Sequence, residues 1–262
     1  MPVQLKDKTV FVTGGASGIG ESVVRMAIEA GAAVVALDLD AENLEQLTVS
    51  LDAGDQLKTY AADVTDEDAV RNAVEFTRST YGSIDGCFNN AGIAGTPAPI
   101  PDTPATQFDR VMRINAYGVF NVLKYTMAVM REQKSGSIVN CASTAGLGGI
   151  GNSSPYVASK HAVIGLTLTA GVEAGYYGVR VNAVCPGWTW TPIQKWVGEE
   201  IYNDADRAAE IQQQLAANVP LQRFAQPDEV ARAVTFLLSD EASYIAGETI
   251  RIDGGFLSGY MS

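Results

Sequence analysis

Short apolar runs alternate along the chain with longer segments in which apolar residues recur every three or four positions. The runs have the length of buried strands, and the longer segments have the spacing of amphipathic helices. This alternation is typical of parallel strands joined by crossover helices, so we predict an α/β fold with a doubly wound parallel sheet of about seven strands flanked by helices. The predicted strands are residues 10–12, 33–37, 58–61, 86–88, 137–142, 181–184 and 249–252.

Helical spacing predicts the segments that join these strands. No linker rich in Pro or Ser interrupts the pattern, so residues 1–262 are expected to form a single domain. Ser154 is expected as an N-cap with Pro155 as the first helical residue. The stretch 188–215 contains no predicted strand and holds all three tryptophans, and we expect it to form a substrate lid. The predicted helices are residues 21–30, 41–51, 66–81, a long helix within 106–134, 156–177 and 227–239.

A glycine-rich turn follows the first predicted strand and leads straight into a helix. Thr13 and Gly14 are followed by Gly18 and Gly20. Without Cβ atoms the backbone can approach a pyrophosphate closely, and N–H groups at the helix start can face the anion. The alternative is a tight turn that holds no ligand.

The second predicted strand ends at an acidic residue, Asp38, 18 residues after Gly20. A carboxylate at this place can bind the ribose diol of a dinucleotide. The alternative is an ordinary helix N-cap, but Asp40 is better placed to cap the helix that follows. Glycine turn and acidic residue together favour a Rossmann-type sheet.

Polar or small residues follow the other strands at the edge where open α/β sheets bind ligands. Asp63 and Val64 follow the third strand, residues 89–92 follow the fourth, and Ser143 follows the fifth. A polar loop, a core valine and a plain turn are the alternatives for the first two places. Asn115 lies inside the long predicted helix, where asparagine is a poor helix former and needs a reason.

Tyr156 and Lys160 stand one turn apart on the same face of a predicted helix. An ammonium group at that distance favours the phenolate, which makes the phenol a usable proton donor and acceptor. The alternative is a surface pair worth roughly a few tenths of a kcal/mol. His161, the single histidine, points about 100° away round the helix, which disfavours a Ser-His-Asp triad.

Composition narrows the range of partners. The net charge is −12, with 30 acidic and 18 basic residues, so neither a nucleic acid nor an anionic membrane is expected to bind. We find neither a secretory leader nor a membrane span and expect a cytoplasmic protein. Cys87, Cys141 and Cys185 fall within or at the end of predicted strands, so buried thiols are expected rather than disulfides or a metal site.

Taken in chain order, these motifs resemble the short-chain dehydrogenase/reductase family over nearly the whole chain. The resemblance implies that Tyr156 transfers a proton, Ser143 holds the substrate oxygen, and Asn115 holds a water that connects Lys160 to solvent. The implied catalytic residues are Asn115, Ser143, Tyr156 and Lys160. The implied cofactor contacts are Gly14, Ser17, Gly18, Ile19, Gly20, Asp38, Asp63, Val64, Asn90, Ala91, Gly92, Tyr156, Lys160, Pro186, Gly187 and Thr191.

The cofactor is expected to be NAD(H) rather than NADP(H). Asp38 would repel a 2′-phosphate, and neither Leu39 nor the turn 14–17 supplies a cation to pair with one. We also expect a homo-oligomer, and the family implies a tetramer. The helix 156–177 is apolar or small nearly all round, so its outer face needs a partner.

The substrate is expected to be a neutral, largely apolar secondary alcohol or its ketone, cyclic or aryl. The predicted pocket wall carries few charges, although the tryptophans in it could instead pack within the lid. Alternatives are a 3-oxoacyl-carrier or sugar dehydrogenase/reductase of the same family, and a non-catalytic NAD-sensing protein. Five acidic residues against two basic ones in 188–215 disfavour a charged thioester. The predicted wall is Ile93, Ala94, Ala145, Leu147, Ile150, Trp188, Trp190 and Ile193.

Overall fold

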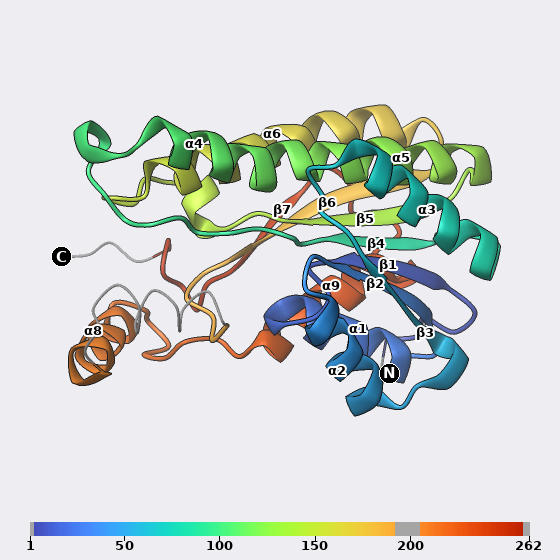
Figure 1. Cartoon of the computed structure of the whole chain (residues 1–262), viewed down its shortest axis with the longest axis horizontal. Helices are drawn as coiled ribbons and strands as arrows, with labels where there is room; N and C mark the ends of the chain where they lie inside the picture. The colour runs from blue at the N-terminus through green and yellow to red at the C-terminus, as the bar shows by residue number, and fades with distance from the viewer. Residues whose placement is uncertain (1–2, 192–204, 259–262) are drawn as a thin grey trace.

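The protein is built on one seven-stranded sheet in which every pair of neighbouring strands is parallel (Figure 1). The computed structural model describes residues 3–191 and 205–258. The strand order is β3-β2-β1-β4-β5-β6-β7, which confirms the predicted doubly wound α/β fold. The strands are β1 (Thr9–Thr13), β2 (Ala33–Asp38), β3 (Leu57–Ala61), β4 (Gly86–Asn89), β5 (Gly136–Cys141), β6 (Val179–Pro186) and β7 (Thr249–Ile252).

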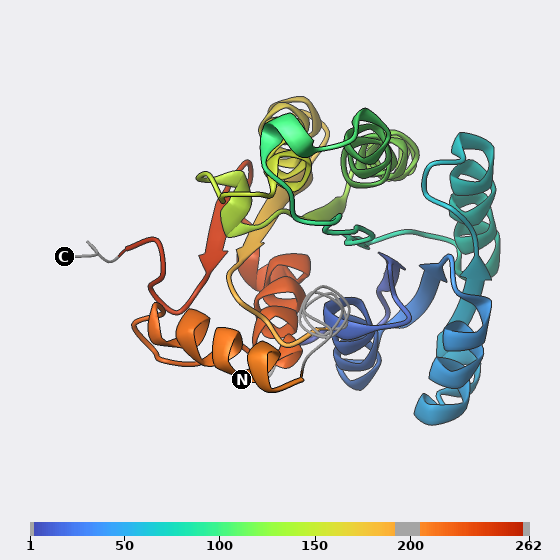
Figure 2. The ribbon, with the colours of Figure 1, turned by 60° about the vertical axis from the view of Figure 1, so that its left-hand side comes forward.

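Helices cover both faces of the sheet. On one face lie α1, α2 and α9, with α1 and α9 side by side (Figure 2), and on the other lie α3, α5 and α6. Their bounds are α1 (Gly18–Glu29), α2 (Ala41–Leu51), α3 (Glu67–Tyr81), α4 (Ala105–Met112), α5 (Val119–Gln133), α6 (Ser154–Gly175), α8 (Ala205–Ala217) and α9 (Pro227–Leu238).

The alternation of side chains along each strand divides the interior into two cores. In β1, Val10 and Val12 belong to the core under α1 and α9, whereas Phe11 belongs to the core under α3 and α5. All three side chains are fully buried. A strand covered on both faces has no solvent side, so it reads as a continuous apolar run rather than an alternating one.

The order of the strands creates a place for a ligand. The chain builds β1, β2 and β3 outward in one direction, and then returns to place β4 on the other side of β1. The turns that follow β1 and β4 therefore leave in opposite directions and open a crevice at the carboxyl ends of the strands. All the strands are parallel, so their carboxyl ends lie along the same edge of the sheet.

Two local predictions need correction. The long helix expected within 106–134 is divided into α4, a π-helical segment (Arg113–Gly118) and α5. The helix α6 begins at Ser154, so Ser153 rather than Ser154 occupies the N-cap, and its side chain makes no capping hydrogen bond. Of the lid predicted at 188–215, residues 192–204 lie outside the described part of the chain.

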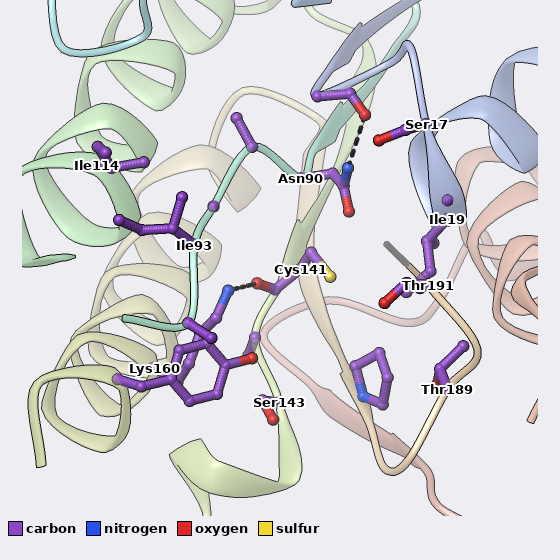
Figure 3. A pocket seen from close by; sticks show the side chains of 18 of the residues that line it. Ser17, Ile19, Asn90, Ile93, Ile114, Cys141, Ser143, Lys160, Thr189 and Thr191 are labelled. Carbon is purple, nitrogen blue, oxygen red and sulfur yellow. Dashed lines mark hydrogen bonds between the residues drawn. The ribbon is translucent and has the colours of Figure 1, made fainter. Parts of the chain in front are cut away.

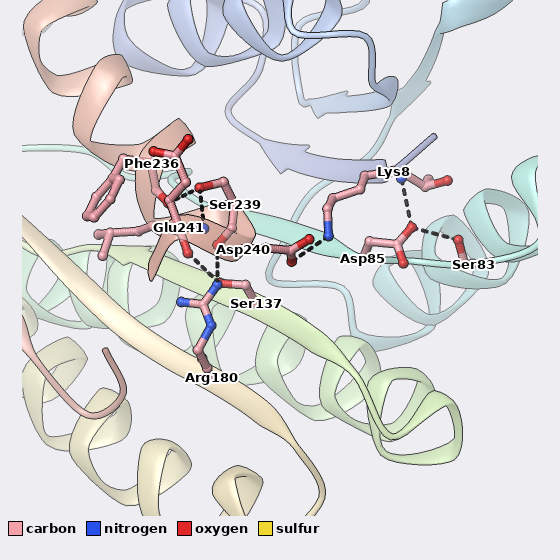
Figure 4. Close-up of polar contacts among 11 residues, drawn as sticks. Lys8, Ser83, Asp85, Ser137, Arg180, Phe236, Ser239, Asp240 and Glu241 are labelled. Carbon is pink, nitrogen blue, oxygen red and sulfur yellow. Dashed lines mark hydrogen bonds and ion pairs between the residues drawn. The ribbon is translucent and has the colours of Figure 1, made fainter. Parts of the chain in front are cut away.

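Hydrogen bonds hold the carboxyl end of α9 to the amino ends of β5 and β6 (Figure 4). The guanidinium of Arg180 donates from Nη2 to the carbonyl oxygen of Ser239 at 2.9 Å and from Nη1 to that of Ile245 at 3.4 Å. Ser137 Oγ donates to the carbonyl of Leu237 at 2.8 Å. The bonds to Leu237 and Ser239 satisfy carbonyl groups that the end of α9 leaves without a partner within the helix, and the bond to Ile245 holds the segment that follows.

Replacing Arg180 with Met should lower the free energy of unfolding by about 2 kcal/mol, because charged hydrogen bonds are lost and the carbonyl group of the buried Ser239 loses its donor. Urea denaturation measures the change. Arg78→Met is the matched control: it removes an exposed ion pair with Glu132 and should cost less than about 1 kcal/mol. Equal effects of the two variants would contradict the fastening role of Arg180.

Candidate active site

A cavity of about 760 Å³ opens at the carboxyl ends of the strands. Turns that follow β1 to β6 supply its wall, together with parts of α4 and α6 and the segment after β7. The predicted site residues that line it are Gly14, Ser17, Gly18, Ile19, Asp38, Asp63, Val64, Asn90, Ala91, Gly92, Ile93, Ala94, Ser143, Ile150, Tyr156, Lys160, Pro186, Gly187, Trp188 and Thr191. Predicted residues that do not line it are Gly20, Asn115, Ala145, Leu147 and Trp190, and Ile193 lies outside the described residues.

The glycine turn after β1 forms one end of the cavity. Gly14 and Gly18 have φ angles of 61° and 55°, a backbone region that other residues rarely adopt. A Cβ on Gly20 would collide with the carbonyl oxygen of Gly14, so Gly20 shapes the turn from behind without lining the cavity. The first turn of α1 begins at Gly18, where the N–H groups of a helix start could receive an anion.

The turn after β4 is tied to the glycine turn by hydrogen bonds to the end of β1. Thr13 Oγ1 accepts from the backbone N–H groups of Asn90 at 3.0 Å and Ala91 at 3.2 Å. Asn90 Nδ2 donates to the carbonyl of Gly14 at 3.0 Å, as Figure 3 shows. The asparagine predicted at the site thus braces the two turns that flank the crevice.

Asp38 presents a fixed carboxylate beside the glycine turn. Its Oδ2 accepts from the N–H of Ala16 at 3.0 Å, and its Oδ1 accepts from the N–H of Asp40 at 3.2 Å. Asp40, as the sequence suggested, caps α2 by accepting from the N–H groups of Glu42 and Asn43. Asp38 is therefore not a helix cap, and it faces the cavity.

Lys160 and Tyr156 stand on the first turns of α6 at the other end of the cavity. Lys160 is only 4% exposed, and its Nζ donates to the carbonyl of Cys141 at 2.8 Å (Figure 3). The same Nζ lies 5.6 Å from the centre of the Tyr156 ring. A buried ammonium group needs a hydrogen-bond acceptor, and the end of β5 supplies it. That bond fixes the positive charge beside the phenol.

Ser143 stands two residues after Cys141, the residue of β5 whose carbonyl accepts the hydrogen bond from Lys160 (Figure 3). Its Oγ accepts from the N–H of Ala145 at 3.1 Å, so the hydroxyl hydrogen stays available for a donor bond into the cavity. Ala145 is fully buried in the short 3₁₀ turn behind Ser143, which explains why it does not line the cavity as predicted.

Asn115 lies in the π-helical segment and is fully buried. Its Oδ1 accepts from the N–H of Ile93 at 2.8 Å, and its Nδ2 donates to the carbonyl of Ile93 at 2.8 Å and to Ser159 Oγ at 3.0 Å. The side chain of Asn115 thus holds the cavity wall at Ile93. These hydrogen bonds explain why a poor helix former stands within the helical segment. The water contact implied for Asn115 remains a prediction.

Apolar side chains form much of the rest of the cavity wall. Trp188 lines the cavity and stacks on Phe224, with ring centres 5.9 Å apart, whereas Trp190 does not line it and packs on the same ring at 5.2 Å. Phe224 lies outside the predicted lid 188–215, so the described partner of both tryptophans is a residue beyond the lid. Phe256, from the segment after β7, also lines the cavity, and sequence analysis missed it. The sequence could have indicated Phe256, because it follows the carboxyl end of β7, as other cavity residues follow their strands.

Arg110 is a second residue that the sequence analysis missed. It lines the cavity from α4, one helical turn before Ile114, which also lines it. Lys160 and Arg110 are the two cations among the lining residues that the structure describes. The part of the wall around Asp38 holds no described cation.

The described part of the chain shows neither a metal site nor a reactive thiol or histidine at the cavity. No group of three or more His, Cys, Asp or Glu residues there could hold a metal ion. The three cysteines are free and buried, and burial raises the pKa of the Cys87 thiol to about 12. His161 contacts the carbonyl of Val157 through Nδ1 and does not line the cavity. No described helix is long and apolar enough to cross a bilayer.

The geometry fits a dinucleotide. One cavity is lined by a fixed carboxylate, by a helix start that could receive an anion and by a Tyr/Lys pair that could transfer a proton. The adenosine ribose, the pyrophosphate and the nicotinamide of a dinucleotide require partners of these three kinds, in this order. The cavity volume also lies within the range of small-molecule sites.

Known proteins are similar to the chain over almost its full length. Residues 14–257 match a family model described as enoyl-(acyl carrier protein) reductase. Levodione reductase of Leifsonia aquatica is 42% identical over 260 residues, covering 97% of this chain and 96% of that protein. The 2,5-dichloro-2,5-cyclohexadiene-1,4-diol dehydrogenase of Sphingobium indicum is 37% identical over 253 residues, covering 96% and 98%.

Solved structures agree. The crystal structure of levodione reductase has a TM-score of 0.94 at 39% identity, covering 98% of this chain and 100% of that one. NAD+-bound xylitol dehydrogenase has a TM-score of 0.89 at 37% identity, covering 96% and 99%.

Short sequence stretches resemble two of these relatives in particular. They are residues 130–133, 149–152, 160–161 and 238–244, which look most like levodione reductase and the cyclohexadienediol dehydrogenases. Relatives of both kinds are among the matches, which confirms that resemblance. With identities of 37% and 42% over nearly the whole length, the chain belongs to the short-chain dehydrogenase/reductase family, and it is an oxidoreductase of the kind that uses a nicotinamide cofactor.

Proposed function

We propose that this enzyme uses NAD(H) to interconvert a neutral, largely apolar secondary alcohol and its ketone, with a cyclic or aryl skeleton. The observation that carries the proposal is the arrangement along one cavity. Tyr156, Lys160 and Ser143 stand at one end, and Asp38 and the glycine turn stand at the other. A protein that only senses NAD needs no such proton-transfer pair.

The chain's own residues supply the proton chemistry. In ketone reduction, the Tyr156 phenol gives its proton to the substrate oxygen, and in alcohol oxidation the phenolate takes it back. Ser143 donates a hydrogen bond to the same oxygen and holds it beside the phenol. The Lys160 ammonium, fixed by the carbonyl of Cys141, stabilises the phenolate between these steps. The nicotinamide ring, when bound, supplies or accepts the hydride at the substrate carbon.

The preference for NAD(H) rests on Asp38. Its carboxylate is held by two backbone N–H groups at the place where the adenosine ribose would lie, and the wall around it holds no described cation. A 2′-phosphate would meet a negative charge there without a partner.

The free thiols Cys87, Cys141 and Cys185 support the cytoplasmic location expected from the sequence.

The preference for an apolar substrate rests on the cavity wall near Tyr156. The wall combines two aromatic rings with aliphatic side chains. One relative is named for a cyclohexadiene diol, a cyclic secondary alcohol. Xylitol dehydrogenase, by contrast, is named for a polyol, which keeps a sugar substrate as the second candidate. The apolar residues that line the cavity include Ile93, Ala94, Pro97, Ile150, Trp188 and Phe256.

We further infer that the stretch 188–215 closes over the substrate as a lid. Its first residues are held at the cavity by the stacking of Trp188 on Phe224 and by a backbone bridge from Thr189 to Ala225. Trp188 also lines the cavity, so the proposed lid begins beside the substrate.

A panel of cyclohexanols, phenylethanols, dihydrodiols, sugars and acyl thioesters tests the activity, with absorbance at 340 nm as the readout. We expect turnover of cyclic or aryl alcohols, and a kcat/KM for NADH at least about tenfold above that for NADPH. Preference for a sugar or a charged thioester would overturn the substrate class. A higher kcat/KM for NADPH would overturn the cofactor assignment.

Tyr156→Phe should lower kcat by about 100-fold or more, because it removes the hydroxyl that transfers the proton. Binding of NADH, followed by its fluorescence, should stay close to that of the wild type. Lys160→Ala should weaken both turnover and NADH binding. If Tyr156→Phe kept more than a few per cent of the activity, another group would have to be the acid/base.

We propose that the enzyme is a homotetramer, as the family resemblance implies. On α6, Leu168 and Val172 are 47% and 67% exposed, and Phe120 on the neighbouring α5 is 46% exposed. A shallow groove runs between these helices. A second copy related by a two-fold axis would cover this apolar face. The groove is lined by Met112, Arg113, Ala116, Tyr117, Phe120, Ala162, Gly165, Leu166 and Thr169.

Light scattering at micromolar concentration should give about four times the chain mass of 27.7 kDa. Val172→Glu should lower that mass, because it places a charge within the proposed interface. Val49→Glu is the matched control, since Val49 on α2 is 75% exposed and lies outside this face. A wild-type mass near 27.7 kDa would rule out the oligomer.

A further inference from the structure

Asn121 on α5 has a fully buried side-chain amide. Its Nδ2 donates to the carbonyl of Val64 at 2.9 Å, while its Oδ1 has no partner among the residues that the structure describes. The orientation of the amide is fixed, because exchanging the two atoms would bring Oδ1 against the carbonyl oxygen of Val64. A buried acceptor without a partner is costly and calls for an explanation.

The same face of the helix holds Val64 through a second contact. Gly118 stands three residues before Asn121, so the two residues are neighbours on the helix surface. A Cβ on Gly118 would lie 2.7 Å from Cγ2 of Val64, which is closer than real Cβ contacts come. The glycine therefore lets the loop approach α5 closely, and the amide bonds its carbonyl group.

The loop that these residues hold forms part of the cavity wall. Ala62, Asp63 and Val64 follow β3, and all three line the cavity. The N–H of Ala62 donates to the carbonyl of Asp38 at 2.9 Å, so the loop lies next to the residue proposed to bind the ribose. Asp63 Oδ1 accepts from the N–H of Thr65 at 2.8 Å, which tightens the turn. The carbonyl of Val64 points away from the cavity, into the protein, toward Asn121.

We propose that Asn121 is a positioning residue for the adenosine half of the cofactor. It does not line the cavity, and it acts through Val64 by holding the loop 62–65 at the distance from Asp38 that the base and ribose require. The unpaired Oδ1 is tolerated because the donor at Nδ2 is needed. An apolar side chain of the same shape would avoid the orphaned oxygen and would release the loop. The inference rests on the proposed dinucleotide site.

Asn121→Leu separates this role from a purely structural one. Isothermal titration calorimetry with AMP and with ADP-ribose, using the protein free of cofactor, should show binding weakened by about tenfold. The KM for NADH should rise by a similar factor while kcat stays unchanged. Reduced nicotinamide mononucleotide, which lacks the adenosine half, should react equally well with the variant and the wild type.

Thr126→Val is the matched control. Thr126 is a fully buried residue on the same helix, but its hydroxyl donates to the carbonyl of Val122 within α5. This variant should bind AMP as the wild type does. If Asn121→Leu also bound AMP normally, the positioning role would be wrong. A wild-type protein that bound neither AMP nor ADP-ribose would instead overturn the proposed cofactor site.

Gly118→Ala provides a second test that leaves the amide in place. The added methyl group must push Val64 outward, so AMP binding should weaken while the melting temperature stays within a few degrees of the wild type. This variant decides the matter if Asn121→Leu fails to fold. Unchanged AMP binding by a folded Gly118→Ala would overturn the proposal, because the loop position would then not matter to the adenosine site.

Discussion

At the crevice between β1 and β4, the two strands send their turns in opposite directions, and side chains must hold the diverging backbone together. A buried polar chain does so. Asn89 Nδ2 donates to Asn140 Oδ1 at 3.1 Å, and Asn140 Nδ2 donates to Thr167 Oγ1 on α6 at 2.9 Å. Thr13 on β1 begins this series of hydrogen bonds, because its Oγ1 donates to Asn89 Oδ1 at 3.4 Å. The same oxygen accepts the backbone N–H groups of the turn after β4. Hydrogen bonds are strong inside a protein, and a buried polar group left without a partner is costly. This series of hydrogen bonds therefore fixes the glycine turn relative to α6.

The two ends of the cavity can therefore work as one site. The end proposed to bind phosphate is shaped by the backbone of the glycine turn, and the end proposed to transfer a proton is shaped by the first turns of α6. Their separation is determined by β1, β4 and β5 and by the buried amides between them. Lys160 belongs to the same arrangement, because its acceptor is the last carbonyl of β5.

The sequence predicted the sheet and most of the helices because each strand is covered on both faces and so appears as an apolar run. It also placed Asp38 and Asp40 in different roles, since only one of them precedes a helix. It could not distinguish Trp188 from Trp190, because which ring faces the cavity depends on Phe224, more than 30 residues away. The sequence did not predict the π-helical segment for a related reason. The hydrogen bonds between Asn115 and Ile93 are tertiary contacts between residues 22 positions apart.

Backbone groups, rather than side chains, receive most of the polar bonds that shape this site. Lys160 is anchored on the carbonyl of Cys141, Asn115 holds both backbone groups of Ile93, and Asn121 holds the carbonyl of Val64. A main-chain acceptor survives any substitution of the residue that carries it, except where a new side chain cannot fit. Wall residues such as Ile93 can therefore be exchanged while the scaffold keeps its shape. Such a scaffold is evolvable, since new substrates can be accommodated without rebuilding the catalytic geometry.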